Sequence, residues 1–256
     1  MSKTTLLLWI LTSAPAFSQS SSLAPAADGR SGSRGRETLN YTVEWRLITA
    51  GKARLDLVPL SSPKQGYQVG LHLESSGLVS KLFKVEDDYL SNLNQNFCAQ
   101  SLQITSHEGN RQRETKVSFD NEAHRAAYLE RDKVKNTTVL QQEIDIPACV
   151  HDVIGGIYQM RTLNLEPGQS AQIPVSDGKK AVMARIEAQQ HEDIKTPAGT
   201  FKTTRHEIYL FNGVLYKRQA HMYVWLTDDR RKLPVQLRVR LQFTIGTITF
   251  LLARQE

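Results

Sequence analysis

Apolar and polar residues alternate along most of this 256-residue chain, and that period of two restricts the fold more than any other feature. From Leu39 to Leu47, for example, every second residue is apolar or aromatic. Gly, Pro, Asn and Asp separate the alternating segments as turns. Because strands joined by short turns pair antiparallel, the pattern predicts an antiparallel sheet with strands near 39–47, 53–57, 67–73, 84–92, 98–107, 112–119, 124–131, 169–175, 179–191, 201–211, 219–227, 233–243 and 246–252.

One segment departs from this period. Between Val150 and Leu163 apolar residues recur every three to four positions, which indicates an amphipathic helix with Asp152 as its N-cap or first-turn acid. Gly155 and Gly156 each lower its helix propensity by about 1 kcal/mol relative to alanine. Residues 76–82 suit a short helical turn. The sequence therefore predicts a mainly β fold: a large curved antiparallel sheet, an open or half β-barrel, wrapped around one or two short helices. A closed lipocalin-like barrel and a two-sheet sandwich also fit.

The first residues have the features of a secretory signal. Lys3 precedes the apolar run 6–11, which is too short to span a bilayer, and Ala16 and Ser18 supply the small side chains that signal peptidase requires. Residues 19–36 are rich in Ser, Gly, Ala and Pro, which is typical of a disordered linker. We therefore expect a signal peptide at 1–18, a linker at 19–36 and a single β domain at 37–256. Because no Cys follows the apolar run, we expect a periplasmic or secreted protein without a lipid anchor.

Charge and cysteine content narrow the possible partners. The formal charge of the chain is +6. Of this, +2 belongs to the linker, which contains Arg30, Arg34 and Arg36 but only one acidic residue, Asp28. The remaining basic excess is weak, so we expect no nucleic-acid binding. No other segment is apolar enough to span a membrane, so we expect no transmembrane span in the mature chain. Because an exported chain permits disulfides, we predict one between Cys98 and Cys149, with two buried thiols as the alternative.

No catalytic or metal-binding motif is recognisable in the sequence. The His-Glu pairs at 107–108, 191–192 and 206–207 lack the second histidine of an HExxH zinc site, and GxSxG and phosphate-binding loops are absent. In a strand, the neighbours in Asp87-Asp88 and Asp228-Asp229 would point to opposite faces, which is a poor geometry for shared acid–base chemistry. We therefore expect no catalytic residue, no metal, no cofactor and a protein that is not an enzyme.

Aromatic residues are the remaining indication of a binding surface, because many fall at positions of strand periodicity. On a curved sheet such residues can line an apolar groove for a ligand, or they can pack as core against the helix. The candidates for a ligand groove are Trp45, Phe83, Tyr89, Tyr158, Tyr223 and Trp225.

The chain resembles the DUF3108 family over residues 37–252. That family's pattern L-x-Y-x-V-x-W … A-G-x-A is similar to residues 39–45 and 50–53, and its most specific part resembles W-L-T-D-D-x-x-x-x-P-V at 225–235. The resemblance places family-motif positions, each with a structural explanation, at Gly51, Asp152, Arg161, Pro197, Gly199, Phe201, Thr227, Asp228, Asp229, Arg231, Pro234 and Gly246. Asp152 and Arg161 flank the predicted helix with charges that suit its dipole. The acidic pair 228–229 and the basic pair 230–231 suit a polar turn with a local ion pair, and Pro234 suits the start of a strand.

The resemblance implies an exported bacterial protein of no established activity, with a fold similar to the half-barrels of lipoprotein-carrier proteins. One departure is Gly155-Gly156, where the family has better helix formers; we expect it to loosen the helix and enlarge a groove. Together these features predict a non-enzymatic envelope protein that binds a hydrophobic or lipid-like ligand, or an envelope partner, through its curved sheet. The alternatives are an interaction module without a small-molecule site, which uses its sheet edges, and a hydrolase of envelope polymers.

Overall fold

The structure is a computed structural model, and it describes residues 35–61, 65–241 and 246–256. The predicted signal peptide at 1–18 and all but the last two residues of the predicted linker at 19–36 lie outside these ranges, so both remain predictions. The first strand begins at Glu37. In the described ranges, no helix is long and apolar enough to cross a membrane.

The described residues form fourteen strands and two short helices. The helices are α1 (Gly77–Leu82) and α2 (Val153–Met160). The strands are β1 (Glu37–Trp45), β2 (Ile48–Leu60), β3 (Gly66–Ser75), β4 (Val85–Asn94), β5 (Ala99–Glu108), β6 (Arg111–Asp120), β7 (Arg125–Asp132), β8 (Thr137–Asp145), β9 (Ser170–Ser176), β10 (Ala181–Thr196), β11 (Gly199–Tyr209), β12 (Ala220–Thr227), β13 (Pro234–Leu241) and β14 (Thr247–Gln255).

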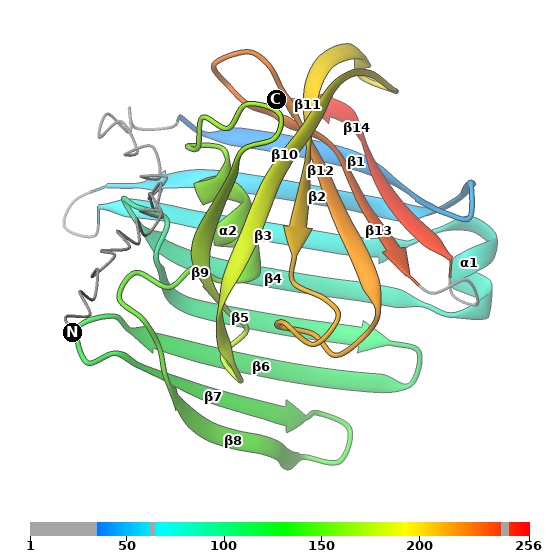
Figure 1. The fold of residues 1–256 in the computed structure, drawn as a ribbon. Helices are drawn as coiled ribbons and strands as arrows, with labels where there is room; N and C mark the ends of the chain where they lie inside the picture. The colour runs from blue at the N-terminus through cyan, green and yellow to red at the C-terminus, as the bar shows by residue number, and fades with distance from the viewer. Residues whose placement is uncertain (1–34, 62–64, 242–245) are drawn as a thin grey trace, which may run out of the picture.

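All fourteen strands belong to one antiparallel sheet, built from two meanders. Strands β1 to β8 follow one another, strands β9 to β14 do the same, and β14 pairs with β1 to join the two meanders. Strands β8 and β9 are the edges, so the sheet does not close. The strands of the second meander cross in front of those of the first, with α2 between them (Figure 1). We call the face that encloses α2 the concave face.

This architecture confirms the predicted open or half β-barrel, which here wraps around the short helix α2, and a closed barrel is excluded. The predicted helix at 150–163 is real but shorter, because α2 ends at Met160. The predicted turn at 76–82 is α1. Strand β8 is a correction, because the alternation does not predict it. Its inward side chains are Leu140, Gln142 and Ile144, so a polar residue interrupts the apolar series.

A disulfide ties the connection that leads into α2 to the first meander. Cys98, in the β4–β5 turn, is bonded to Cys149, four residues before α2 begins, which confirms the predicted pairing. The sequence separation is 51 residues. In the chain-entropy model, a loop of this length stabilises the folded state by about 4 kcal/mol. The disulfide therefore holds the segment that leads into α2 against the first meander.

Candidate ligand-binding face

Helix α2 fills one half of the concave face. Asp152 caps it, as predicted: its carboxylate accepts a hydrogen bond from the amide of Gly155 at 2.7 Å and another from the hydroxyl of Ser91 on β4. A Cβ at position 155 would lie 3.0 Å from the side chain of Leu93 and 3.2 Å from a backbone oxygen. The glycine therefore lets the helix approach β4 closely. The expectation that the glycine pair enlarges a groove is wrong, because Gly155 closes the space instead.

Three aromatic rings complete this filled half. Tyr67 on β3 stacks on Phe97 with ring centroids 4.9 Å apart, and Phe97 stacks on Tyr158 of α2 at 5.9 Å. Tyr158 has no exposed surface. Because the rings continue the packing from the sheet to the helix, this half of the concave face is ordinary protein core.

The other half of the concave face is apolar but only half covered. On five strands the inward side chains change from buried to half-buried with increasing distance from α2. The last buried and first half-buried positions are Tyr41 and Val43 on β1, Val69 and Leu71 on β3, Leu102 and Ile104 on β5, Val235 and Leu237 on β13, and Leu252 and Phe250 on β14. The same change on five strands shows that one continuous region lies uncovered.

The half-buried residues are neighbours across the sheet. Phe250 pairs in register with Val43 and with Leu237, and Tyr89 pairs with Leu71 and Ile104. Together with Leu73 they are partly buried, and they pack against the main hydrophobic core. We call the surface formed by Val43, Leu71, Leu73, Tyr89, Ile104, Leu237 and Phe250 the open half of the concave face.

The environment of Tyr89 shows how apolar this surface is. Burial, with smaller contributions from Asp87 and Glu108, raises the pKa of its phenol to about 12.

Gly51 lies beside Val43 on β2, and a Cβ there would lie only 2.2 Å from the backbone oxygen of Glu74. This family-motif glycine therefore allows β2 and β3 to approach closely beneath the open half.

The concave face becomes charged on β6 and β7. The guanidinium of Arg113 lies 2.6 Å from the carboxylate of Asp132 and 3.7 Å from that of Glu130. The hydroxyl of Tyr128 donates to Glu130 at 2.9 Å. Burial raises the pKa of Asp87, the inward residue next to Tyr89 on β4. An apolar strip bordered by charge suits a ligand with an apolar chain and a polar group.

The six aromatic residues predicted to line a groove lie in five different places. Trp45 continues the inward series of β1, and Tyr89 lies in the open half. Tyr158 is in the filled half, and Phe83 is exposed after α1. Tyr223 and Trp225 lie on the opposite, convex face of β12. There the indole N–H of Trp225 donates to Glu192 at 2.8 Å, so the side chain packs within the protein.

Arg161 joins three parts of the fold at the end of α2. It is 2 % exposed, and its guanidinium makes two hydrogen bonds to the carboxylate of Glu37 on β1, at 2.6 and 2.8 Å. It also donates to the backbone oxygen of Arg231 in the β12–β13 turn at 3.1 Å, and it stacks over Tyr158. The sequence suggests only a favourable helix-end charge for Arg161, whereas the structure shows a buried ion pair.

The remaining family-motif residues shape turns. Thr227 donates to Asp229 at 2.7 Å, and Arg231 pairs with Asp229 at 3.0 Å, as the sequence predicts for this polar turn. Pro234 begins β13, as predicted, and its carbonyl accepts from the hydroxyl of Tyr41 at 2.8 Å. Pro197 and Gly199 (φ 134°) form the β10–β11 turn, Phe201 follows it half-buried, and Gly246 (φ 91°) precedes β14.

Asp228 belongs to a small polar cavity of about 160 Å³ that the sequence does not predict. Thr204 donates to Asp228 at 2.7 Å, and its hydroxyl lies 3.0 Å from Nδ1 of His191. Asp228 lies 3.5 Å from that same nitrogen. In a catalytic triad the nucleophile and the carboxylate contact different ring nitrogens. Here both contact Nδ1, so the arrangement does not activate Thr204 as a nucleophile.

The side chains around the polar cavity at Asp228 do not form a metal site. The described residues contain no cluster of three or more His, Cys, Asp or Glu side chains that could hold a metal ion. His206 lies beside the cavity, 6 % exposed, and its Nδ1 is 3.0 Å from the carbonyl oxygen of Thr204. Burial lowers its pKa to about 4, so the ring is neutral at physiological pH.

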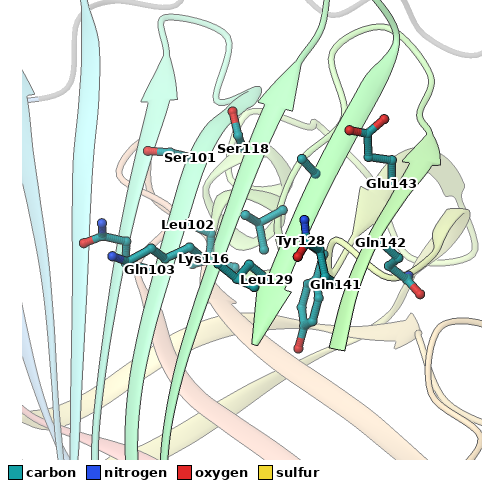
Figure 2. Close-up of a pocket in the computed structure, with 12 residues that line it drawn as sticks. Ser101, Leu102, Gln103, Lys116, Ser118, Tyr128, Leu129, Gln141, Gln142 and Glu143 are labelled. Carbon is teal, nitrogen blue, oxygen red and sulfur yellow. The ribbon is translucent and has the colours of Figure 1, made fainter. Parts of the chain in front are cut away.

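Strand β8 presents a free edge next to a shallow hollow. The amide of Ile146 donates to the carbonyl of His124 beside β7. Because strand amides alternate in direction, those of Gln141, Glu143 and Asp145 point away from β7. The hollow, of about 330 Å³, lies over β5 to β8 and is lined by polar side chains such as Lys116, Gln141 and Glu143 together with apolar ones such as Leu129 (Figure 2).

Comparison with known proteins places the chain in a family without adding a function. No curated protein matches it. Among solved structures, a β-barrel-like protein of the domain of unknown function DUF1849 from Brucella abortus is 6 % identical, with a TM-score of 0.53 over 87 % of this chain and 97 % of that chain. This likeness shows a shared fold.

Two more distant structures are also similar. One is a Bacteroides fragilis protein, inferred to be exported, with a YmcC-like fold: 9 % identity, TM-score 0.36, covering 87 % of this chain and 96 % of that chain. The other is a DUF1089 family protein from Pseudomonas aeruginosa: 13 % identity, TM-score 0.39, covering 75 % and 90 %. The family model for DUF3108, described as a protein of unknown function, matches residues 40–253. The predicted resemblance is thereby confirmed, and the chain belongs to the DUF3108 family.

Proposed function

We propose that this protein binds a hydrophobic or lipid-like ligand on the open half of its concave face, and that it does so without catalysing a reaction. The observation that carries the proposal is the change from buried to half-buried apolar side chains along five strands. Water-exposed apolar surface is unfavourable at about 25 cal/mol per Å². A concave apolar surface that the protein itself leaves uncovered therefore favours a ligand that covers it.

The ligand that fits this surface has an apolar chain and a polar group. The chain would lie along Val43, Leu71, Leu237 and Phe250, and the polar group would lie towards the charges of β6 and β7. Export by the predicted signal peptide would place the protein in the periplasm or outside the cell. Lipids of the cell envelope are the ligands of this chemistry in that compartment.

The absence of catalysis is part of the proposal. Thr204, His191 and Asp228 bring a hydroxyl, an imidazole and a carboxylate together, but their contacts do not suit nucleophilic catalysis. The hydrolase alternative would need a group that is activated for reaction and faces a substrate. The contacts around Thr204 favour a structural role.

The test combines lipid extraction with displacement of a bound fluorescent fatty acid. Mass spectrometry of the purified protein should detect a co-purifying lipid, and the probe should bind. Replacing two residues of the open half, Leu71→Gln with Leu237→Gln, should weaken probe binding by about tenfold or more, because two apolar contacts are lost. Met183→Gln is the matched control, since Met183 is exposed on the convex face. The proposal would be contradicted if the double variant bound the probe as tightly as the native protein does. It would also be contradicted if no lipid co-purified and the probe did not bind.

A second candidate function is an interaction module, and the free edge of β8 favours it. An extended segment of an envelope partner could add to this edge through the outward amides of Gln141, Glu143 and Asp145. Glu143→Pro would remove one such amide, whereas Glu143→Ala would keep it. A cross-linker at Gln141 that captures a polypeptide in the alanine variant and not in the proline variant would favour this function, above all if no lipid is found.

A further inference from the structure

Most of the exposed large apolar residues lie at one end of the sheet. The described structure leaves nine such side chains exposed, and six of them lie in or directly beside the connections at the end opposite α2. The exposed fraction is 92 % for Leu47, 75 % for Leu82 and 65 % for Leu78. The other three are Ile48, Phe83 and Val134. Isolated exposed apolar residues are ordinary, but a concentration at one end indicates a binding surface.

The antiparallel order of β1 to β8 brings these connections together. The β1–β2 turn, the β3–β4 connection with α1, the β5–β6 turn and the β7–β8 turn all lie at this end, and Figure 1 shows α1 and α2 towards opposite ends. Backbone hydrogen bonds tie α1 to its neighbours: the amide of Ser76 donates to Ala50 at 2.8 Å, and that of Gly109 donates to Lys84 at 2.7 Å. We call residues 46–48, 76–84, 109–110 and 133–136 the rim.

The rim is basic as well as apolar. It contains Arg46, Lys81, Lys84, Lys133 and Lys135, and it contains no Asp or Glu. Acidic side chains on the adjoining strands partly balance three of these: Lys84 pairs with Glu86 at 2.8 Å and Lys133 with Glu114 at 3.8 Å, and the backbone amide of Lys135, together with its charge, helps to lower the pKa of Asp132. By contrast, the β6–β7 turn at the opposite end contains Glu122.

Helix α1 has the character of a surface-binding element. It has no buried residue, although its sequence GLVSKL is largely apolar. Leu78 and Leu82 are four residues apart and so share one face, with Lys81 between them in the chain and Lys84 after it. A segment that presents leucines and lysines together fits the boundary between lipid headgroups and acyl chains.

We propose that the rim docks onto the surface of an anionic phospholipid bilayer. The leucines and Phe83 enter the boundary below the headgroups, while the five basic side chains contact lipid phosphates. A bilayer fits better than a protein partner, because the apolar residues are spread over several connections and alternate with positive charge. Docking would bring the open half of the concave face close to the membrane, since Val43 and Leu73 are each within four residues of the rim. The docking itself does not depend on the proposed ligand.

The test is co-sedimentation of the purified protein with vesicles. Vesicles that contain phosphatidylglycerol should bind the protein, binding should weaken as salt rises, and pure phosphatidylcholine vesicles should bind it at least about tenfold less. Leu78→Ser with Leu82→Ser should lower binding to the anionic vesicles by a similar factor. Met183→Ser with Leu90→Ser is the matched control, since both residues are exposed and lie within β10 and β4, outside the rim.

Two results would overturn the proposal: no binding to the anionic vesicles, or equal losses in the rim and control variants. Circular dichroism of the variants checks that the fold is kept, which is expected because no residue of α1 is buried. Probe binding to the open half should be unchanged in the rim variant. A failure of membrane docking is therefore distinguishable from a failure of the proposed ligand binding.

Discussion

At the scale of single residues, His206 links stability to pH. Its pKa is lowered to about 4 by burial, against about 6.5 in an unfolded chain. The neutral ring is therefore favoured in the folded state. Between pH 6.5 and 4 the unfolded chain binds a proton that the folded protein does not, so stability that is present above pH 6.5 is lost as pH falls through this window.

We expect this loss to reach about 3 kcal/mol in the free energy of unfolding by pH 4. Urea unfolding at several pH values measures it, and comparison with His206→Gln separates it from the titration of carboxylates. The variant should lose less stability between pH 6.5 and 4 than the native protein. Parallel pH curves for the two proteins would contradict the assigned burial of His206.

Some residue roles follow from the sequence and others do not. The cap by Asp152, the disulfide and the turn pair of Asp229 and Arg231 depend on residues close in sequence or on a count of two cysteines, so local patterns predict them. The pair of Arg161 and Glu37 joins residues 124 positions apart. Such a pair depends on how the meanders meet, which no local pattern contains.

At the scale of elements, the pair of Arg161 and Glu37 holds α2 against β1. The guanidinium side chain is 1 % exposed and the carboxylate 14 %. Removing one partner of a buried pair leaves a charge without compensation, which typically costs about 3–5 kcal/mol. We therefore expect Glu37→Gln to lower the free energy of unfolding by up to this amount in chemical denaturation. The pair of Arg254 and Glu256 is exposed, so Glu256→Gln should leave stability nearly unchanged. Similar losses in both variants would show that the ion pair is not a specific stabilising contact.

Elements are predictable from the sequence to the extent that one face is apolar. Strands β1 to β7 and β9 to β14 carry that pattern and are predicted, although β2, β10 and β14 extend beyond their predicted limits. Strand β8 is an edge strand, and most of its side chains are exposed. The need to bury one face therefore imposes little alternation of apolar and polar residues on its sequence. The extent of α2 is also not predictable, because the residues after Met160 keep the helical spacing although the helix has ended.

At the scale of the whole molecule, the open half of the concave face is the feature that the sequence predicts least. Half-buried and fully buried apolar residues have the same pattern along a strand: Tyr41 and Val43 are indistinguishable until the position of α2 is known. The six predicted groove aromatics illustrate this, since Tyr89 reaches the open half while Tyr158 belongs to the core. The curved sheet is therefore predictable, and the uncovered part of it is not.

The ligand site is tested most directly by photolabelling the purified protein with a fatty acid that carries a diazirine, followed by peptide mapping. A ligand on the open half should leave adducts on β1, β3, β13 and β14 at or beside Val43, Leu71, Leu237 and Phe250, and unlabelled fatty acid should compete for them. Labels confined to the convex face, or labels that unlabelled fatty acid does not displace, would contradict a ligand site on the open half of the concave face.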